Sequence, residues 1–240
     1  MGIRIIVPDV LTGATERGAP ATLTTPRHRV TFSQARIPTG GDITAVPTEV
    51  GNTVTVVQPP VLRADPFYYG AFRGTVNDQD DQIRLSATPA ISMAGFTTIM
   101  IARLKTVQLG DGYTSLFYMM PPGGNRSDLT LWAPSGARVL RFTTGAGTNV
   151  DHGWTPDTQW HVFSVTQSGD SVAVGVDGQE AIVTGIDTLA SNGFNIGQRR
   201  GGGFSAIDVA DVAIFPYMAL ADRRAEMTNL ADFYNIEMAA

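Results

Sequence analysis

The chain has 240 residues, of which 43% are hydrophobic, and a formal net charge of −5. This length suits one large β-sandwich or barrel, and the acidic balance gives no indication of a nucleic-acid partner, which would need a basic face. Because the sequence has no cysteine, a disulfide framework and a thiolate metal site are both excluded. Apolar runs are too short for a membrane span, and Met1–Asp9 does not have the pattern of a secretory signal.

Residues 1–40 support two interpretations. Arg4–Val7 and Arg29–Arg36 have the composition of strands, whereas Thr12–Arg27 is rich in Thr, Ala, Pro and Gly and is expected to be an extended loop. The segment therefore either supplies the first strands of the domain or forms an arm that docks on a neighbour. Residues 41–240 are expected to form the main domain.

Short runs rich in Val, Ile, Thr and Phe follow, separated by Gly and Pro, and this spacing predicts many strands and few helices. Asp177-Gly178 comes after Val172, Val174 and Val176, which share one strand face, so a hairpin turn is expected there. The predicted strands are Thr53–Gln58, Phe96–Lys105, Tyr113–Met119, Asp128–Ala133, Arg138–Thr143, Trp160–Thr166, Ser171–Asp177, Glu180–Thr184 and Ile207–Phe215.

The end of the chain has a different periodicity. An acid, Asp222, lies near the start of this segment, where it favours the helix dipole. We expect a single C-terminal helix of about three turns, docked on the sandwich. The apolar positions at helical spacing are Leu220, Met227, Leu230, Ala231 and Tyr234.

Seven motifs follow one another between about residues 55 and 236. They are Phe72–Leu85, Phe96–Leu104, Trp160–Thr166, Asp170–Glu180, Phe194–Gly197, Ile207–Phe215 and Ala219–Arg224. In order and spacing they resemble the laminin-G-like branch of the concanavalin A-like lectin and glucanase superfamily. The resemblance implies an all-β fold, a two-sheet antiparallel β-sandwich (concanavalin A-like jelly roll) with one short C-terminal helix. It does not imply a ligand, because one fold hosts many functions.

The glucanase branch carries catalytic carboxylates at alternate positions of one strand, in the pattern E-x-D-x-E. No glutamate of this chain begins that pattern. Asp208 and Asp211 are another pair to consider, but their spacing would place them on opposite faces of a strand. We therefore expect no enzymatic activity and assign no catalytic residue.

Asn77–Asp81 gathers oxygen ligands of the kind that hard cations prefer. Some laminin-G-like modules bind calcium at a rim of the sandwich, so the resemblance makes Asp78, Asp80 and Asp81 a candidate Ca²⁺ site. The alternative is that these acids only form a turn. No other cofactor is expected.

The candidate ligand-binding residues come from two predicted loops. The loop over Asn149–Asp157 presents Trp154 between Gly153 and Pro156, and an exposed aromatic face of this kind stacks on sugars. The glycine-rich connection supplies arginines suited to an acidic glycan or to a neighbouring subunit. Solvated loops are the alternative in both places, and Trp160 and His161 are assigned to packing. The candidate ligand residues are Asp151, His152, Trp154, Arg199 and Arg200.

Together these observations predict a non-enzymatic structural or adhesion protein on the surface of a bacteriophage or phage-like particle. Its expected partners are other virion proteins, further copies of itself and a cell-surface glycan that its lectin-like domain binds. The alternative is a free extracellular carbohydrate-binding lectin module, and the third hypothesis is a glycan-cleaving enzyme.

Overall fold

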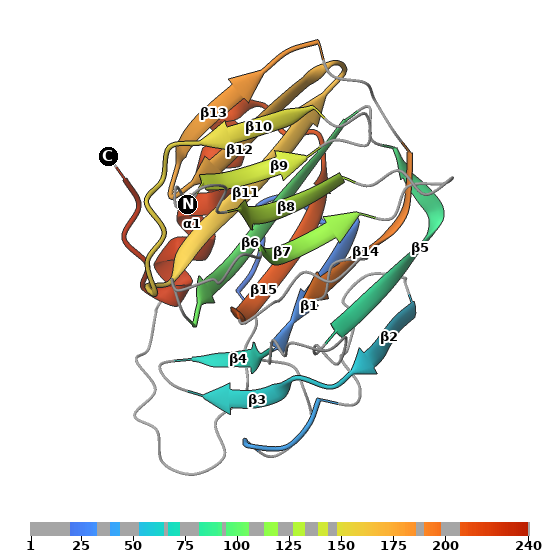
Figure 1. Ribbon diagram of the computed structural model, residues 1–240, viewed down its shortest axis with the longest axis vertical. Coiled ribbons are helices and arrows are strands. Elements are labelled where there is room, and N and C mark those ends of the chain that lie inside the picture. Colours follow the sequence, from blue (N-terminus) through green and yellow to red (C-terminus); the bar gives the residue numbers. More distant parts are fainter. Residues whose placement is uncertain are drawn as a thin grey trace, which may run out of the picture.

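The computed structural model describes residues 20–32, 39–43, 53–64, 67–72, 82–92, 95–105, 113–119, 127–132, 139–143, 148–185, 190–197 and 207–239. Within these ranges the chain forms strands β1 to β15 and one helix, α1. The strands build two antiparallel sheets that lie face to face (Figure 1). This arrangement confirms the predicted all-β sandwich with a C-terminal helix.

The first sheet carries the helix on its outer face, and we call it the helix-side sheet. β1 (His28–Thr31) pairs with Asp211–Ile214 of the last strand, whereas β4 (Tyr68–Ala71) pairs with Asp208 and Val209 further along the same edge. Residues 28–31 are therefore part of this sheet. Its order is β13 (Gln179–Val183), β12 (Ser171–Val176), β11 (His161–Ser168), β6 (Gly95–Leu104), β15 (Ile207–Pro216), β4 (Tyr68–Ala71) and β3 (Val61–Ala64).

The second sheet lies in front of the first in Figure 1. Two of its strands, β2 (Thr53–Gln58) and β7 (Tyr113–Met119), have the bounds that the sequence predicts. By contrast, β10 occupies the start of a segment predicted to be a loop, so that part of the prediction is wrong. The order is β10 (Asn149–His152), β9 (Val139–Thr143), β8 (Ser127–Trp132), β7 (Tyr113–Met119), β14 (Ala190–Gly197), β5 (Gln82–Ser92) and β2 (Thr53–Gln58).

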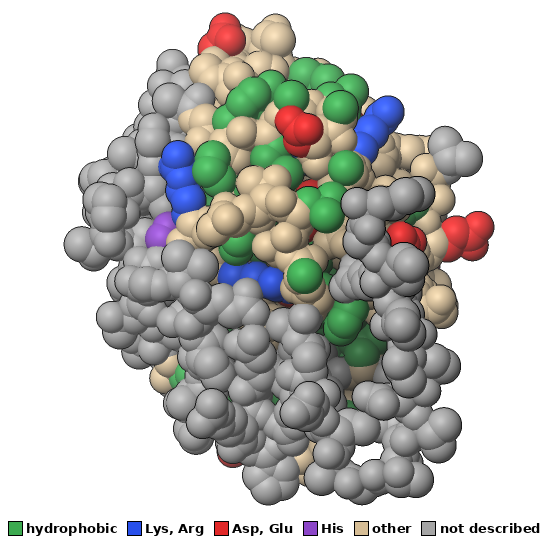
Figure 2. Space-filling model, turned by 180° about the vertical axis from the view of Figure 1, so that it is seen from behind, with side chains coloured by type: hydrophobic (Ala, Val, Ile, Leu, Met, Phe, Trp, Pro, Cys, Tyr) green, Lys and Arg blue, Asp and Glu red, His purple; other side chains and the backbone are tan. Residues whose placement is uncertain are grey.

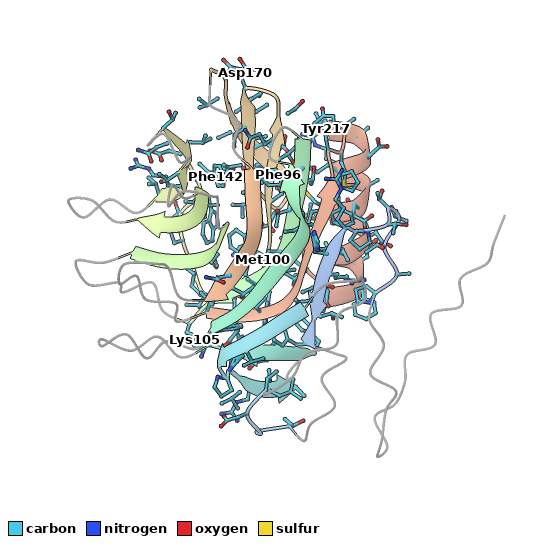
Figure 3. All side chains as sticks on the ribbon, turned by 90° about the vertical axis from the view of Figure 1, so that its right-hand side faces the viewer. Phe96, Met100, Lys105, Phe142, Asp170 and Tyr217 are labelled. Carbon is cyan, nitrogen blue, oxygen red and sulfur yellow. The ribbon has the colours of Figure 1, made fainter. Side chains whose placement is uncertain are left out.

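The main core lies between the two sheets. Phe96 and Met100 of β6 face Phe142 of β9 across this space, and all three side chains are buried (Figure 3). Val172, Val174 and Val176 share the same core, as their alternation predicts. Each such side chain removes apolar surface from water, which provides the main driving force for closing the sandwich.

The helix α1 (Leu220–Tyr234) covers the opposite face of the helix-side sheet. It confirms the predicted helix, and its 15 residues make about four turns instead of three. The helix begins without a side-chain cap and ends at Asn235, whose left-handed φ of 53° turns the chain back. Its apolar side contributes Met227, Leu230, Ala231 and Tyr234 to a second core with Ile99, Ile101, Val162 and Phe215.

Buried charged groups hold the helix in place. Arg223 donates two 2.7 Å hydrogen bonds to the Glu180 carboxylate of β13. The carboxylate of Glu226 accepts the backbone N–H groups of Leu23 and Thr24, at 2.8 and 2.9 Å. Burial raises the pKa of Glu226, although these N–H donors act in the opposite direction. Glu226 thus holds the segment before β1 against α1.

A second buried pair joins β1 to β15. Arg29 donates to both carboxylate oxygens of Asp211, at 3.1 and 2.5 Å, and each side chain is only 2% exposed. Tyr234 of α1 adds a hydrogen bond of 3.3 Å to the same carboxylate. The pair therefore links β1, β15 and α1 in one place.

The last strand contains an irregularity that the sequence does not reveal. The register of β15 against β6 shifts between Val209 and Asp211, so Ala210 forms a bulge. Asp208 binds Arg103, and Asp211 binds Tyr234 of the covering helix. Both aspartates thus lie on the helix side of the sheet, and the expectation of opposite faces is wrong. Each aspartate nevertheless forms a salt bridge with an arginine, Asp211 with Arg29 and Asp208 with Arg103.

Among the described residues, the one helix does not have the length and apolar character needed to cross a bilayer.

We expect Arg29→Met to lower the free energy of unfolding by about 3–5 kcal/mol, because it leaves the Asp211 carboxylate buried without its cation. The double variant Arg29→Met/Asp211→Leu should lose less than the two single variants combined. Denaturant unfolding measures both quantities. Arg63→Met, at an exposed arginine of β3, is the control and should change the free energy by less than about 0.5 kcal/mol. Additive losses in the double variant would contradict this account of the pair.

Candidate functional site

A cavity of about 520 Å³ opens where the end of α1 meets the start of β11, and we call it the helix-end pocket. Four of its lining side chains are aromatic: Phe67, Trp160, Phe233 and Tyr234. The polar part of the lining consists of carboxylates, amides and one imidazole, supplied by Asp157, Gln159, His161, Asp177, Asn235 and Glu237. A concave site with a few convergent polar groups is the usual form of a small-ligand site.

The aromatic side chains of the pocket form a continuous row. The ring centroids of Phe233 and Tyr234 are 5.0 Å apart, those of Tyr234 and Phe67 are 4.8 Å apart, and those of Phe67 and Trp160 are 4.7 Å apart. Such tilted and edge-to-face contacts hold each ring in a fixed orientation. Phe233 at the end of the row is 43% exposed, so the pocket presents an apolar wall that is open to solvent.

Trp160 is fixed from its other side by a cation. The Arg103 guanidinium lies 4.9 Å from the Trp160 ring and 5.3 Å from the Tyr69 ring. Asp208 holds this guanidinium through a hydrogen bond of 2.8 Å. The indole N–H of Trp160 is buried and has no acceptor among the described residues. The orientation of the indole therefore depends on ring contacts and on Arg103.

His161 lies between two carboxylates. Its Nδ1 is 2.6 Å from Asp177 and its Nε2 is 2.8 Å from Asp157. Burial would lower the pKa of His161, but the hydrogen bonds and the charges of the two carboxylates outweigh burial and raise it. Only the imidazolium donates from both nitrogens. This arrangement, in which Asp157 and Asp177 bind the two nitrogens of His161, is called the His161 clamp. It therefore favours a positively charged imidazole ring.

The position of Asp177 follows from the hairpin that the sequence predicts. Asp177 and Gly178 have positive φ values of 50° and 88°, as a two-residue type I′ turn requires. The turn directs the carboxylate back to β11, where Asp177 also accepts the Val162 N–H at 2.9 Å. The backbone carbonyl of Asp177 accepts the N–H of Ala239 at 2.9 Å. The tail after Asn235 is thereby held along the pocket.

The structure separates the ligand residues that the sequence places together. Asp151 is exposed on the outward face of the second sheet, where Arg141 binds both of its carboxylate oxygens. His152 points inward: its Nδ1 accepts the Trp154 N–H and its Nε2 donates to the Gln179 carbonyl, both at 3.0 Å. Both nitrogens of His152 are thus used inside the protein.

Trp154 is half-buried, whereas the sequence suggested an exposed ring. It packs against the core between the sheets, with its ring 4.9 Å from His161 and 5.4 Å from Phe163. Arg199 and Arg200, and the calcium candidates Asp78, Asp80 and Asp81, lie outside the described residues. In the ranges that are described, no group of three His, Asp or Glu side chains is placed to hold a metal ion.

The helix-end pocket combines residues that the sequence analysis had assigned to packing with residues it had not considered. The sequence assigns Trp160 to packing because it matches a core position of the resembled family, and His161 because it lies on a predicted strand. The Asp177-Gly178 turn is the one signal in the sequence that could have indicated the site, because it predicts that Asp177 lies at the end of a hairpin, and Asp177 lines the pocket. No sequence pattern connects Phe67 or Phe233 with that turn.

Comparison with known proteins identifies the fold. No family model and no curated protein matches the sequence. Trypanosoma rangeli sialidase superposes with a TM-score of 0.60 at 13% identity, covering 86% of this chain and 32% of the sialidase. The chain thus spans about a third of that protein.

Two smaller domains give similar results. Domain 4 of AbnA, an extracellular arabinanase from Geobacillus stearothermophilus in complex with arabinotriose, superposes with a TM-score of 0.59 at 14% identity, covering 84% of this chain and 98% of that domain. The binding domain of botulinum neurotoxin DC in complex with SialylT gives 0.59 at 12% identity, with 78% and 48% covered. At these identities the similarity establishes the β-sandwich fold.

The His161 clamp should make stability depend on pH. Because the pKa of His161 is raised above its ordinary 6.5, the clamp stabilises the fold fully below about pH 6.5 and loses this contribution as the pH rises through the folded value. The free energy of unfolding, measured with denaturant between about pH 6 and 9, should fall as the pH rises. His161→Gln should abolish this pH dependence. His28→Gln, at a buried histidine whose pKa is lowered by burial and by Arg27, should retain it. An NMR titration that places the pKa of His161 at or below 6.5 would refute the clamp.

Proposed function

We propose that this chain is a carbohydrate-binding β-sandwich module and that the helix-end pocket binds the glycan. The observation that carries the proposal is the aromatic row beside several polar groups that have no partner among the described residues. Aromatic rings present an apolar face that fits the C–H surface of a sugar, and amides and carboxylates bind its hydroxyls.

Several polar groups of the pocket have no partner among the described residues and can bind a ligand. Among the described residues, none makes a hydrogen bond to the side chains of Gln159, Asn235 or Glu237. Asp157 uses its Oδ1 for His161 and for the Gln159 N–H, at 2.8 and 2.7 Å. Its other oxygen is left for a ligand. The volume of about 520 Å³ lies within the range of typical ligand sites, about 300–1,000 Å³.

The structural neighbours support a sugar ligand by analogy. The arabinanase domain was solved with arabinotriose and the toxin domain with SialylT. Because one fold hosts many functions, this analogy supports the class of ligand, and the choice of site rests on the residues of this chain.

Binding is favoured over catalysis by the state of the two carboxylates. Burial alone would raise the pKa of Asp157, but hydrogen bonds from His161 and the Gln159 N–H, with the charge of His161, lower it. A general acid in glycoside hydrolysis needs a raised pKa. Asp157 and Asp177 instead both bind the same imidazole. We therefore propose a non-enzymatic module.

We further propose that the module is a laminin-G-like surface component of a bacteriophage or phage-like particle, assembled with copies of itself and other virion proteins. This finer assignment is supported by the sequence motifs and by a pocket suited to binding without cleavage. The alternative is a free extracellular lectin.

Fractionation of an infected culture distinguishes a particle component from a free extracellular lectin. We expect mass spectrometry to find the chain in purified particles, which a particle component requires. Detection in the cleared medium but not in particles would favour the free lectin. Detection only in the cytosol of uninfected cells would overturn both locations.

The glycan site is tested by substitution. We expect a glycan array to identify a ligand and Phe233→Ala to weaken its binding about tenfold, because the variant removes the exposed end of the aromatic row. Tyr217→Ala, at an exposed aromatic residue that does not line the pocket, is the matched control. Calorimetry measures both. A flat array with folded protein, or a loss of binding in Trp154→Ala but not in Phe233→Ala, would contradict this placement of the site.

A further inference from the structure

We propose that the helix-end pocket selects glycans that carry an ammonium group, that is, amino sugars, over neutral and anionic glycans. This inference rests on the proposed function and specifies the class of ligand. It follows from the charges that line the pocket and from which of them are already paired.

The lining is acidic. Asp157, Asp177 and Glu237 contribute carboxylates, whereas His161 is the one basic side chain that the described residues supply. Arg103 lies behind the indole of Trp160 and is neutralised by Asp208. On the face that carries α1, acidic side chains lie close to hydrophobic ones (Figure 2). A cationic ligand therefore meets a complementary field, and an anionic ligand meets repulsion.

The three carboxylates have different roles. Asp177 uses both oxygens inside the protein, one for His161 at 2.6 Å and one for the Val162 N–H at 2.9 Å. Asp157 keeps one oxygen without a described partner, and its side chain is 49% exposed. Glu237 is exposed and makes no ion pair with a described residue. Asp177 thus positions His161, while Asp157 and Glu237 are available to an ammonium group.

The aromatic row places a sugar ring next to these acceptors. A ring lying on Phe233 or Phe67 occupies the same cavity as Asp157 and Glu237. An ammonium group donates charge-assisted hydrogen bonds to carboxylates, which are stronger than those from a hydroxyl. It is also attracted to aromatic faces. An N-acetylated sugar carries no ammonium group, so it gains neither the charge-assisted hydrogen bonds nor the attraction to aromatic faces.

The same charges disfavour sialylated glycans. A sialic acid carboxylate would enter a pocket in which three carboxylates, Asp157, Asp177 and Glu237, outnumber the one imidazolium of His161. The specificity of this pocket is therefore expected to differ from that of the sialidase and of the SialylT-bound toxin domain that share its fold.

Calorimetry at about pH 6 and low salt tests the inference with three probes: a β-1,4-linked glucosamine tetramer, its N-acetylated counterpart and sialyllactose. We expect the glucosamine tetramer to bind about tenfold more tightly than the N-acetylated tetramer, and sialyllactose not to bind. The preference should shrink at high salt, because exposed charge pairs are screened.

Isosteric variants identify the acceptors. Glu237→Gln and the double variant Asp157→Asn/Glu237→Gln should reduce the preference for glucosamine several-fold in steps. Asp232→Asn makes the same change of charge at an exposed residue of α1 outside the pocket and should leave the preference intact. Circular dichroism confirms that each variant is folded.

The outcomes separate this inference from the proposed function. If the N-acetylated tetramer or sialyllactose binds as tightly as the glucosamine tetramer, charge selection is overturned and glycan binding stands. If the preference persists in the double variant, these carboxylates do not recognise the ammonium group and the inference fails. If the folded protein binds none of the probes and no glycan on an array, both proposals fail.

Discussion

The docking of α1 on the helix-side sheet is the constraint on which the candidate site depends. One wall of the helix-end pocket belongs to the end of this helix and another to the start of β11. Apolar contacts supply most of the attraction between them, but contacts of this kind have little direction. The bidentate pair of Arg223 with Glu180 and the link from Tyr234 to Asp211 fix the angle and depth of the helix. A helix docked at another angle or depth would leave these charged groups buried without partners.

The pocket shows how a fold can place ligand contacts at the junction of distant segments. Its aromatic row joins Phe67, Trp160 and the last turn of α1. Its polar side comes from residues 157–161, at and before the start of β11, from the Asp177 turn and from Asn235 and Glu237. The sheets themselves contribute mainly rigidity. A ligand therefore encounters side chains that are already oriented, which reduces the entropy lost on binding.

Most of the fold could be predicted from the sequence because its signals are local. Alternation in Val172–Val176 and the Asp-Gly turn identify a hairpin, and apolar residues at helical spacing identify α1. The strand β10 was not predicted, because Asn149–His152 is short and polar and becomes a strand by pairing with β9. Tertiary pairing overrides weak propensity in such segments.

The site was less predictable, for a related reason. His161 looks like a packed histidine in the sequence, and its role depends on Asp157 and Asp177 closing on both ring nitrogens. His152 and Trp154 looked like loop residues, but the strand that includes His152 turns them inward. Which residues share a cavity is decided by long-range packing, and a single sequence carries little information about it.

The bulge at Ala210 has a consequence for how β15 tolerates change. Before it, odd-numbered residues face the inner core; after it, even-numbered residues do. Removing Ala210 itself would restore simple alternation and keep Asp211 on the helix side and Val212 in the inner core. Removing Ala213 would instead act like a reading-frame shift in the structure and turn Ile214 toward the helix. The bulge thus marks the position at which β15 can lose a residue without exchanging its two faces, whereas elsewhere in the strand the loss of a residue is far more disruptive than replacement of one apolar residue by another.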